Sequence, residues 1–161
     1  MTQGPEYTQP DITLIGDEHV RQYRATDGEV GYIWNGAPIL LLTTTGRRSG
    51  EAKTSALIFG RDGDDYLIVG SMGGAPKHPS WYLNLSANPD VEIQVRGDCI
   101  PAVARTASDD EKSRLWQIMT EVWPNYDVYQ TRTDRSIPVV VISPQERSGG
   151  SLAGGVGTRA E

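Results

Sequence analysis

The chain has 161 residues and a mass of 17.6 kDa, so its length predicts one domain with a single core. It carries 15 Lys and Arg against 21 Asp and Glu, and this net charge of −6 argues against nucleic-acid binding, which depends on neutralising phosphates. No apolar run has the length of a membrane-spanning helix, and no secretory signal is visible. The single cysteine, Cys99, excludes an intramolecular disulfide and a cysteine-rich zinc site, and we expect it to be buried or half-buried in a strand. We therefore expect a cytoplasmic protein without a metal site.

The two ends of the chain are polar, and the folded part is expected between them. Residues 145–161 are rich in glycine and predict a flexible tail. The remainder, residues 1–144, is predicted to form one domain, which comprises an N-terminal arm (1–16), a region with a short helix (17–37) and a core (38–144).

Six short strands are predicted in the core. Thr54–Gly60 and Asp65–Val69 flank an Asp-Gly turn, which predicts a hairpin. A second hairpin is predicted where Val91–Arg96 meets Cys99–Thr106 at Gly97-Asp98. Two apolar runs complete the set, Ile39–Thr45 and Pro138–Ile142. The pattern indicates a small antiparallel barrel or sandwich.

Two helices are marked by their ends. Ser108 and Glu111 form a capping-box sequence, and the apolar spacing behind them predicts a helix that packs on the sheet and ends before Pro124. Pro79–Ala87 is the second helix, with Pro79 expected at the first helical position.

The first candidate site is Thr43–Gly50, which reads TTTGRRSG and follows a buried strand. Arg47 and Arg48 supply guanidinium groups that match phosphate or carboxylate oxygens, and Lys53 follows them. The glycines allow backbone N–H groups to approach an anion. The same residues also suit a solvated hairpin turn, and the spacing does not decide between the two.

The second candidate site is Ser71–Trp81, where a strand again ends and a helix begins. Gly73 and Gly74 would let a flat ligand lie against the backbone, and the helix start favours an anion. His78 is interpreted as a surface or cap residue, because a single histidine without partners does not make a triad or a metal site.

The third candidate site contains Trp123, Tyr126 and Tyr129, which are three residues apart and would lie on one side of a helical turn. They suit either a core stripe or the lip of a cleft. Two anion-favouring loops and an aromatic wall, without a set of acid, base, nucleophile or metal ligands, indicate an enzyme whose cofactor supplies the chemistry.

Three segments, TTTGRRSG, SMGGAPKHPSWYLNLSANPDVEIQV and YDVYQTRTDRSIPVVVISP, resemble the deazaflavin-dependent nitroreductase family of actinobacteria. The resemblance extends roughly from Pro38 to Pro144. It implies an α+β, mainly β fold, a split β-barrel like that of FMN-binding proteins, with about six antiparallel strands and flanking helices. It also implies a reductase that passes a hydride from reduced coenzyme F420, a deazaflavin, to electrophilic small molecules. The implied acceptors are quinones, nitroaromatics, enones and α,β-unsaturated lactones.

The resemblance also implies site residues. Tyr126, Ser71 and Tyr129 match positions near the reacting groups, and Trp123 joins the two tyrosines at the acceptor. Residues implied to bind the coenzyme are Arg47, Arg48, Ser49, Lys53, Ser55, Ala56, Leu57, Ile58, Val69, Gly70, Ser71, Met72, Lys77, Ser80, Trp81, Tyr82 and Tyr126. The chain departs from the family pattern at Met72, where many members have Lys, and at Ile58, where many have an aromatic residue.

Alternatives to this reading are an FMN-dependent split-barrel reductase and a non-catalytic carrier of a deazaflavin or tetrapyrrole. The sequence leaves open a monomer or a homodimer. It predicts no stable membrane insertion, because the region before Pro38 has little apolar surface, and it leaves a peripheral membrane contact open.

Overall fold

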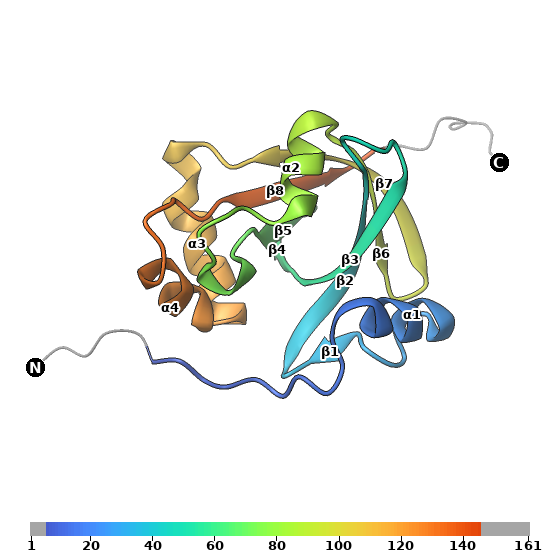
Figure 1. Cartoon of the computed structure of the whole chain (residues 1–161), viewed down its shortest axis with the longest axis horizontal. Coiled ribbons are helices and arrows are strands. Elements are labelled where there is room, and N and C mark those ends of the chain that lie inside the picture. Colours follow the sequence, from blue (N-terminus) through green and yellow to red (C-terminus); the bar gives the residue numbers. More distant parts are fainter. Residues whose placement is uncertain (1–5, 146–161) are drawn as a thin grey trace, which may run out of the picture.

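The computed structural model describes residues 6–145 and shows a strongly curled antiparallel sheet with helices around it (Figure 1). The strands are β1 (Ile33–Trp34), β2 (Ala37–Thr45), β3 (Ala52–Ile58), β4 (Gly60–Asp62), β5 (Asp65–Val69), β6 (Asp90–Val95), β7 (Asp98–Thr106) and β8 (Val139–Pro144). The helices are α1 (Gly16–Thr26), α2 (Ser80–Ala87), α3 (Asp109–Val122) and α4 (Asn125–Thr131), and a 3-10 turn, η1, spans Met72–Gly74. The expected α+β, mainly β fold is confirmed.

The sheet curls until its two ends lie next to each other. The hydrogen-bonded order runs β1-β2-β6-β7-β8-β5-β4, with β3 on the other side of β2. The terminal strands β3 and β4 are consecutive in the chain and are separated only by Phe59, so the sequence itself links the two ends. The sheet is open between β3 and β5, and this split in the barrel positions the site described below.

One predicted hairpin was wrong in its pairing. The Asp-Gly turn forms as expected, but it joins β5 only to the short β4, with Asp62 opposite Asp65. Residues 52–58 pair instead with β2, from Thr45 opposite Ala52 to Ile39 opposite Ile58. The chain leaves the strand at Phe59, whose ring is buried in the core, and this bend divides the expected strand into β3 and β4. Because of β4 and β1, the sheet has more strands than expected.

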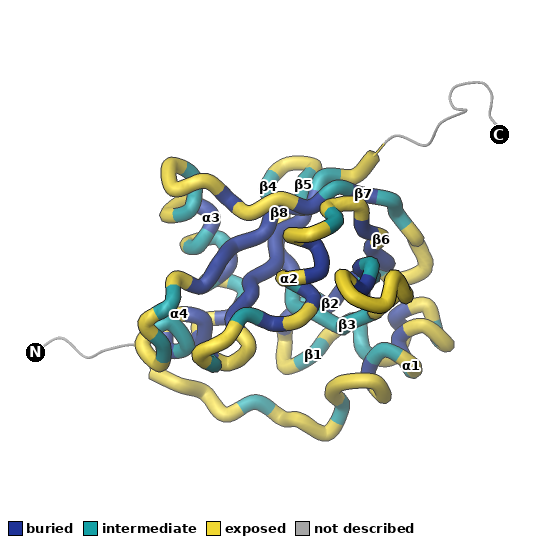
Figure 2. Tube along the Cα trace, turned by 45° about the horizontal axis from the view of Figure 1, so that its top comes forward, coloured by how far each residue is buried: buried dark blue, intermediate teal, exposed yellow. Residues whose placement is uncertain are grey.

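The core lies between the curled sheet and the helices that cover it (Figure 2). The capping box of α3 forms as predicted, and Leu115 and Met119 from its apolar face are fully buried. Pro79 caps α2 and does not occupy its first helical position. Cys99 is exposed, contrary to expectation, because it lies at the outer end of β7.

The N-terminal arm is held against the domain by side chains. Asn125 pairs with the backbone of Thr8 in both directions, accepting from its N–H at 2.9 Å and donating to its carbonyl at 2.7 Å. Asn35 does the same for Asp11 at 2.8 Å in each direction. The arm therefore runs from α4 to β1 along one side of the molecule (Figure 1). The predicted tail lies outside the described residues except for Gln145, and within 6–145 no helix could cross a bilayer.

Candidate active site

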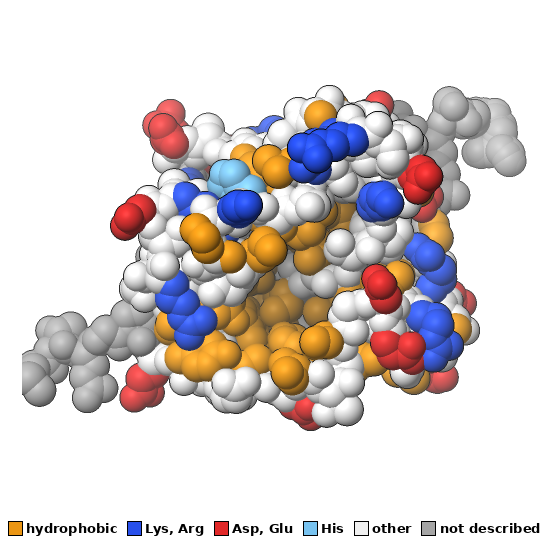
Figure 3. Space-filling model, in the orientation of Figure 1, with side chains coloured by type: hydrophobic (Ala, Val, Ile, Leu, Met, Phe, Trp, Pro, Cys, Tyr) orange, Lys and Arg blue, Asp and Glu red, His pale blue; other side chains and the backbone are white. Residues whose placement is uncertain are grey.

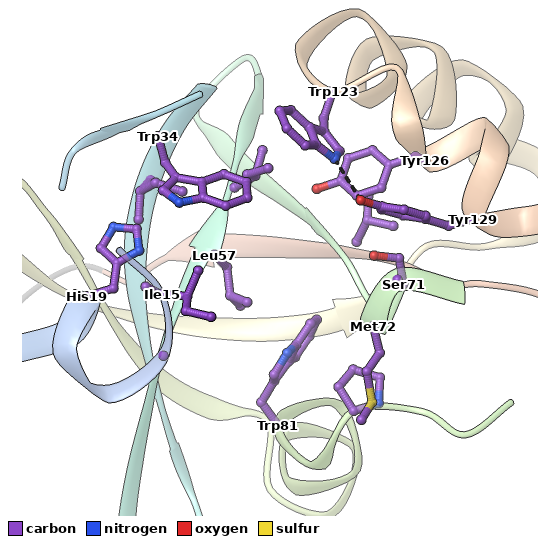
Figure 4. A pocket seen from close by; sticks show the side chains of 17 residues that line it. Ile15, His19, Trp34, Leu57, Ser71, Met72, Trp81, Trp123, Tyr126 and Tyr129 are labelled. Carbon is purple, nitrogen blue, oxygen red and sulfur yellow. Dashed lines mark hydrogen bonds between the residues drawn. The ribbon is translucent and has the colours of Figure 1, made fainter. Parts of the chain in front are cut away.

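A cavity of about 310 Å³ opens at the split in the barrel. Its volume is at the lower end of the range for small-molecule sites. Side chains enter it from β3, from the loop after β5, from the starts of α1 and α2, and from α4 (Figure 4). The lining residues are Ile15, Gly16, His19, Trp34, Ile39, Ala56, Leu57, Ile58, Val69, Ser71, Met72, Gly73, Pro79, Trp81, Trp123, Tyr126 and Tyr129.

Aromatic rings form two walls of this cavity. Trp34 and Trp123 face each other with ring centroids 5.4 Å apart, and Tyr126 and Tyr129 meet edge to face at 6.1 Å. The indole Nε1 of Trp123 donates to the Tyr129 hydroxyl at 3.4 Å, which fixes the side of the cavity formed by α4 (Figure 4). Trp81 closes the opposite end. The walls suit a flat, largely apolar molecule.

Two buried hydroxyl groups on the cavity surface have no hydrogen-bond partner among residues 6–145. The Tyr126 side chain is 4% exposed and Ser71 is 7% exposed, and both hydroxyls point into the cavity (Figure 4). Buried polar groups are normally paired, so these two hydroxyls are available to bond to a polar atom that enters the cavity. Burial raises the pKa of Tyr126, and the nearby Tyr129 adds to the effect, so Tyr126 is a neutral phenol whose O–H is available to donate to a molecule in the cavity.

A basic groove of about 350 Å³ adjoins the cavity, and Trp81 lines both. Lys and Arg side chains gather above the apolar hollow (Figure 3). The groove is formed by the β2–β3 hairpin loop and by α2, and its residues are Gly46, Arg47, Arg48, Ser49, Lys53, Ser55, Ser80, Trp81 and Asn84. The Thr43–Gly50 motif is thus a hairpin loop whose cations line a groove, and its binding of an anion stays a prediction.

Buried Asn84 holds the basic loop in place. Its Oδ1 accepts from the backbone N–H of Arg47 at 3.1 Å and from the Arg47 guanidinium at 2.9 Å, and its Nδ2 donates to Thr44 Oγ1 at 3.2 Å. Sequence reasoning missed this residue, because an asparagine in a helix is usually interpreted as a solvated residue. Its position three residues before the end of α2 carries no signal that it faces a strand loop.

The wall formed by the N-terminal region was also missed. His19 reaches the cavity from α1 and Ile15 from the residue just before this helix, and Trp34 reaches it from β1. His19 is buried, with Nε2 2.8 Å from the carbonyl of Gly31, where a side chain would collide with the imidazole. A carbonyl only accepts, so Nε2 carries the proton. No local pattern distinguishes these residues from an ordinary polar arm and short helix.

Most of the implied site residues lie on the cavity or the groove. Ala56, Leu57, Ile58, Val69, Ser71, Met72, Trp81, Trp123, Tyr126 and Tyr129 line the cavity, whereas Arg47, Arg48, Ser49, Lys53, Ser55 and Ser80 line the groove. Three others line neither: Gly70, Lys77 and Tyr82. The hydroxyl of Tyr82 is 2.8 Å from Thr106 Oγ1 and its ring packs on His78, so this side chain faces away from the cavity.

The comparisons with known proteins agree with this geometry. A family model for the F420H(2)-dependent quinone reductases matches residues 16–144. The chain belongs to this family. It is 48% identical to the F420H(2)-dependent quinone reductase Rv1261c of Mycobacterium tuberculosis over 129 residues, which are 78% of this chain and 87% of the relative.

Two solved structures are also similar to this member of the family. The structure of an F420-H2 dependent reductase (FDR-A) is 42% identical, with a TM-score of 0.62, and the match covers 66% of this chain and 94% of the other. A second structure, described as a domain-swapped dimer, is 38% identical with a TM-score of 0.65, and covers 78% of this chain and 92% of the other. These similarities confirm the split barrel.

The site fits the coenzyme on which the family depends. Coenzyme F420 combines a flat deazaflavin ring with an anionic tail, and the structure places an aromatic-walled cavity beside a cationic groove. The expectations of an oxidoreductase and of coenzyme F420 as its cofactor are confirmed by the family. The FMN enzyme and the non-catalytic carrier are therefore set aside.

Proposed function

We propose that this family member uses reduced coenzyme F420 to reduce quinones to hydroquinones. The observation that carries the proposal is the continuity of the cationic groove with an apolar cavity at Trp81, because the two parts suit a ring with an anionic tail and a flat acceptor above it. The curated relative named as a quinone reductase supports the acceptor class. When bound, the reduced deazaflavin supplies the hydride, and a proton from solvent completes the hydroquinone.

The residues of the groove would hold the anionic tail. Arg47 and Arg48 present guanidinium forks, and Ser49 and Lys53 add further donors. Asn84 fixes the Arg47 backbone and guanidinium before any ligand arrives, which lowers the entropy cost of binding.

The hydroxyls of the cavity would orient the reacting molecules. Tyr126 donates to a quinone oxygen and stabilises the negative charge that develops there during hydride transfer. Ser71, at the end of β5, offers a second hydroxyl, and Tyr129 and Trp123 complete the acceptor wall. Hydride transfer depends mainly on holding donor and acceptor in contact, which accords with a site built from orienting groups.

The same cavity suits other flat electrophiles, and we extend the proposal to nitroaromatics, enones and α,β-unsaturated lactones. All of them present an oxygen that gains negative charge as hydride arrives, and Tyr126 would serve each in the same way. A quinone remains the preferred acceptor in this proposal because a relative is named as a quinone reductase.

A steady-state acceptor screen tests the proposal. Reduced coenzyme F420 is incubated with the protein and one acceptor from a panel of quinones, nitroimidazoles, enones and lactones, and its oxidation is followed by absorbance. We expect oxidation that depends on both protein and acceptor, fastest with a quinone. Binding of the coenzyme without turnover of any acceptor would refute the proposed activity.

We further propose that the protein forms a homodimer, because a structure 38% identical to it is described as a domain-swapped dimer. Light scattering after size exclusion should give twice the chain mass, and the mass of one chain would refute this assembly.

A further inference from the structure

Arg135 lies outside the cavity, and its guanidinium is surrounded by backbone carbonyls. Its Nη2 donates to the carbonyl of Ser71 at 2.8 Å, its Nη1 to that of Gly70 at 3.1 Å, and its Nε to that of Ala75 at 2.9 Å. Nη1 is also 3.1 Å from Nδ1 of His78. No carboxylate among residues 6–145 forms a salt bridge with it.

The loop that these carbonyls belong to has an unfavourable backbone conformation. Met72, Gly73 and Gly74 are consecutive residues with positive φ, at 47°, 65° and 85°. A left-handed conformation at a non-glycine residue such as Met72 has an energetic cost, so the local sequence does not specify this shape by itself. Contacts from elsewhere in the chain hold it. Arg132 donates to the carbonyl of Gly73 at 3.3 Å, and the Arg135 fork spans the loop from Gly70 to Ala75.

Arg135 is in turn attached to the helix that carries the tyrosines. Gln130, one residue after Tyr129, donates to the carbonyl of Arg135 at 2.8 Å and accepts from the N–H of Ile137 at 3.0 Å. The loop also touches this helix directly, because a side chain at Gly74 would lie 2.6 Å from the Tyr129 carbonyl oxygen. The hydroxyl of Ser71 and the hydroxyls of α4 thus belong to one connected unit.

We propose that Arg135 is a positioning residue of the hydride-transfer site, which fixes the Ser71–Ala75 loop and so sets the Ser71 hydroxyl relative to Tyr126. The inference rests on the proposed function. The proposed positioning role requires an arginine. A lysine ammonium is a single centre that cannot reach carbonyls on both sides of the loop, whereas the planar guanidinium of arginine does. Arg135 itself touches neither the cavity nor the groove.

The test compares Arg135→Ala and Arg135→Lys with the unaltered protein, in kcat, in KM for a quinone and in the dissociation constant of coenzyme F420. A misplaced reacting group costs on the order of 10²-fold in rate, so we expect kcat to fall by about that factor in Arg135→Ala. The coenzyme dissociation constant should change much less than kcat, because the groove proposed to hold the anionic tail is intact. Added guanidinium, well below denaturing concentrations, should restore part of kcat in Arg135→Ala.

Arg61→Ala is the matched control. Arg61 also donates to loop carbonyls, those of Gly63 and Asp65, but its turn lies away from the cavity and the groove. Its kcat should be unchanged with and without guanidinium.

A kcat within about twofold of the unaltered protein in Arg135→Lys would overturn the proposal, and so would guanidinium rescue that fails in a folded Arg135→Ala. If Arg135→Ala does not fold, the kcat and coenzyme binding of Arg135→Lys decide the matter. Failure of the proposed function is separate, because it appears as an unaltered protein that turns over no acceptor.

Discussion

Replacing Tyr126 with phenylalanine is expected to leave the fold at least as stable and to impair the reaction. The change removes one oxygen from a side chain that is 4% exposed and keeps the ring that packs against Trp116 and Tyr129. The hydroxyl has no protein partner within residues 6–145, so its removal breaks no internal hydrogen bond. A buried hydroxyl without a partner does not stabilise the fold, and we expect the free energy of unfolding to rise by up to about 1 kcal/mol.

The effect on catalysis has the opposite sign. A hydrogen bond to a charged atom contributes about 1.5–3 kcal/mol, and the quinone oxygen gains charge in the transition state. Tyr126→Phe should therefore lower kcat/KM for the quinone by about 10- to 150-fold.

Urea denaturation followed by tryptophan fluorescence measures the stability, and the acceptor assay measures the rate. Tyr129→Phe is the control, because its hydroxyl accepts from Trp123 at 3.4 Å and its loss should cost about 0.5–1 kcal/mol of stability. A loss of more than about 1 kcal/mol in Tyr126→Phe would show that the hydroxyl has a partner in the folded protein. An unchanged kcat/KM would show that it does not touch the acceptor.

Three further predictions concern the groove and the loop. Arg47→Ala combined with Arg48→Ala should weaken coenzyme binding by about 2 kcal/mol, roughly thirtyfold; the loss is moderate because both side chains are exposed and their charges are partly screened by solvent. A fluorescence titration measures the dissociation constant of the coenzyme, and an unchanged dissociation constant would place the anionic tail of the coenzyme elsewhere. Asn84→Ala should lower both stability and coenzyme affinity, each by about 1–3 kcal/mol, because it removes the hydrogen-bond partner of the Arg47 backbone N–H, of the Arg47 guanidinium and of the buried Thr44 hydroxyl. If neither the stability nor the coenzyme affinity falls, the role assigned to Asn84 is wrong. Burial, and then the charge of Arg135, lower the pKa of His78, so stability should be full above pH of about 6.5 and fall as the pH drops below it. His78→Asn, which keeps an acceptor for Arg135, should lose that pH dependence in urea denaturation at fixed salt, and an unaltered pH profile would refute the assignment.

Much of the fold could be predicted because its signals are local. The Ser108–Glu111 capping box, the strand alternation around Val91–Val95 and the Asp-Gly turn each act within a few residues. Pairing partners are not local, and this is why residues 52–58 were assigned to the wrong neighbour. The strand pattern there suits either partner. The strand is interrupted at the buried Phe59, so that β3 pairs with β2 and only β4 pairs with β5.

The candidate site shows the same division. Arg47, Arg48, Tyr126 and Tyr129 belong to motifs that indicate a ligand by composition. No sequence motif indicates Asn84 or Arg135. Asn84 contacts a residue 37 positions away in the chain, and Arg135 contacts residues 57–65 positions away. The two alternatives left open for the aromatic segment, a core stripe or the lip of a cleft, do not exclude each other, since Trp123 and Tyr126 are buried in the core and also line the cavity.

The sequence by itself determined the chemical inventory: a cationic hairpin loop, a glycine-containing strand end and a set of tyrosines without acid, base or metal partners. These features are set by residue type and short-range spacing. Only the tertiary structure decided that the cationic loop and the aromatic walls meet at Trp81 and that the N-terminal region, through α1 and β1, supplies one wall. It also decided that Arg135 donates to the carbonyls of the loop that presents Ser71. The curling of the sheet is the physical reason, because it brings β3 and the end of β5 to the same opening.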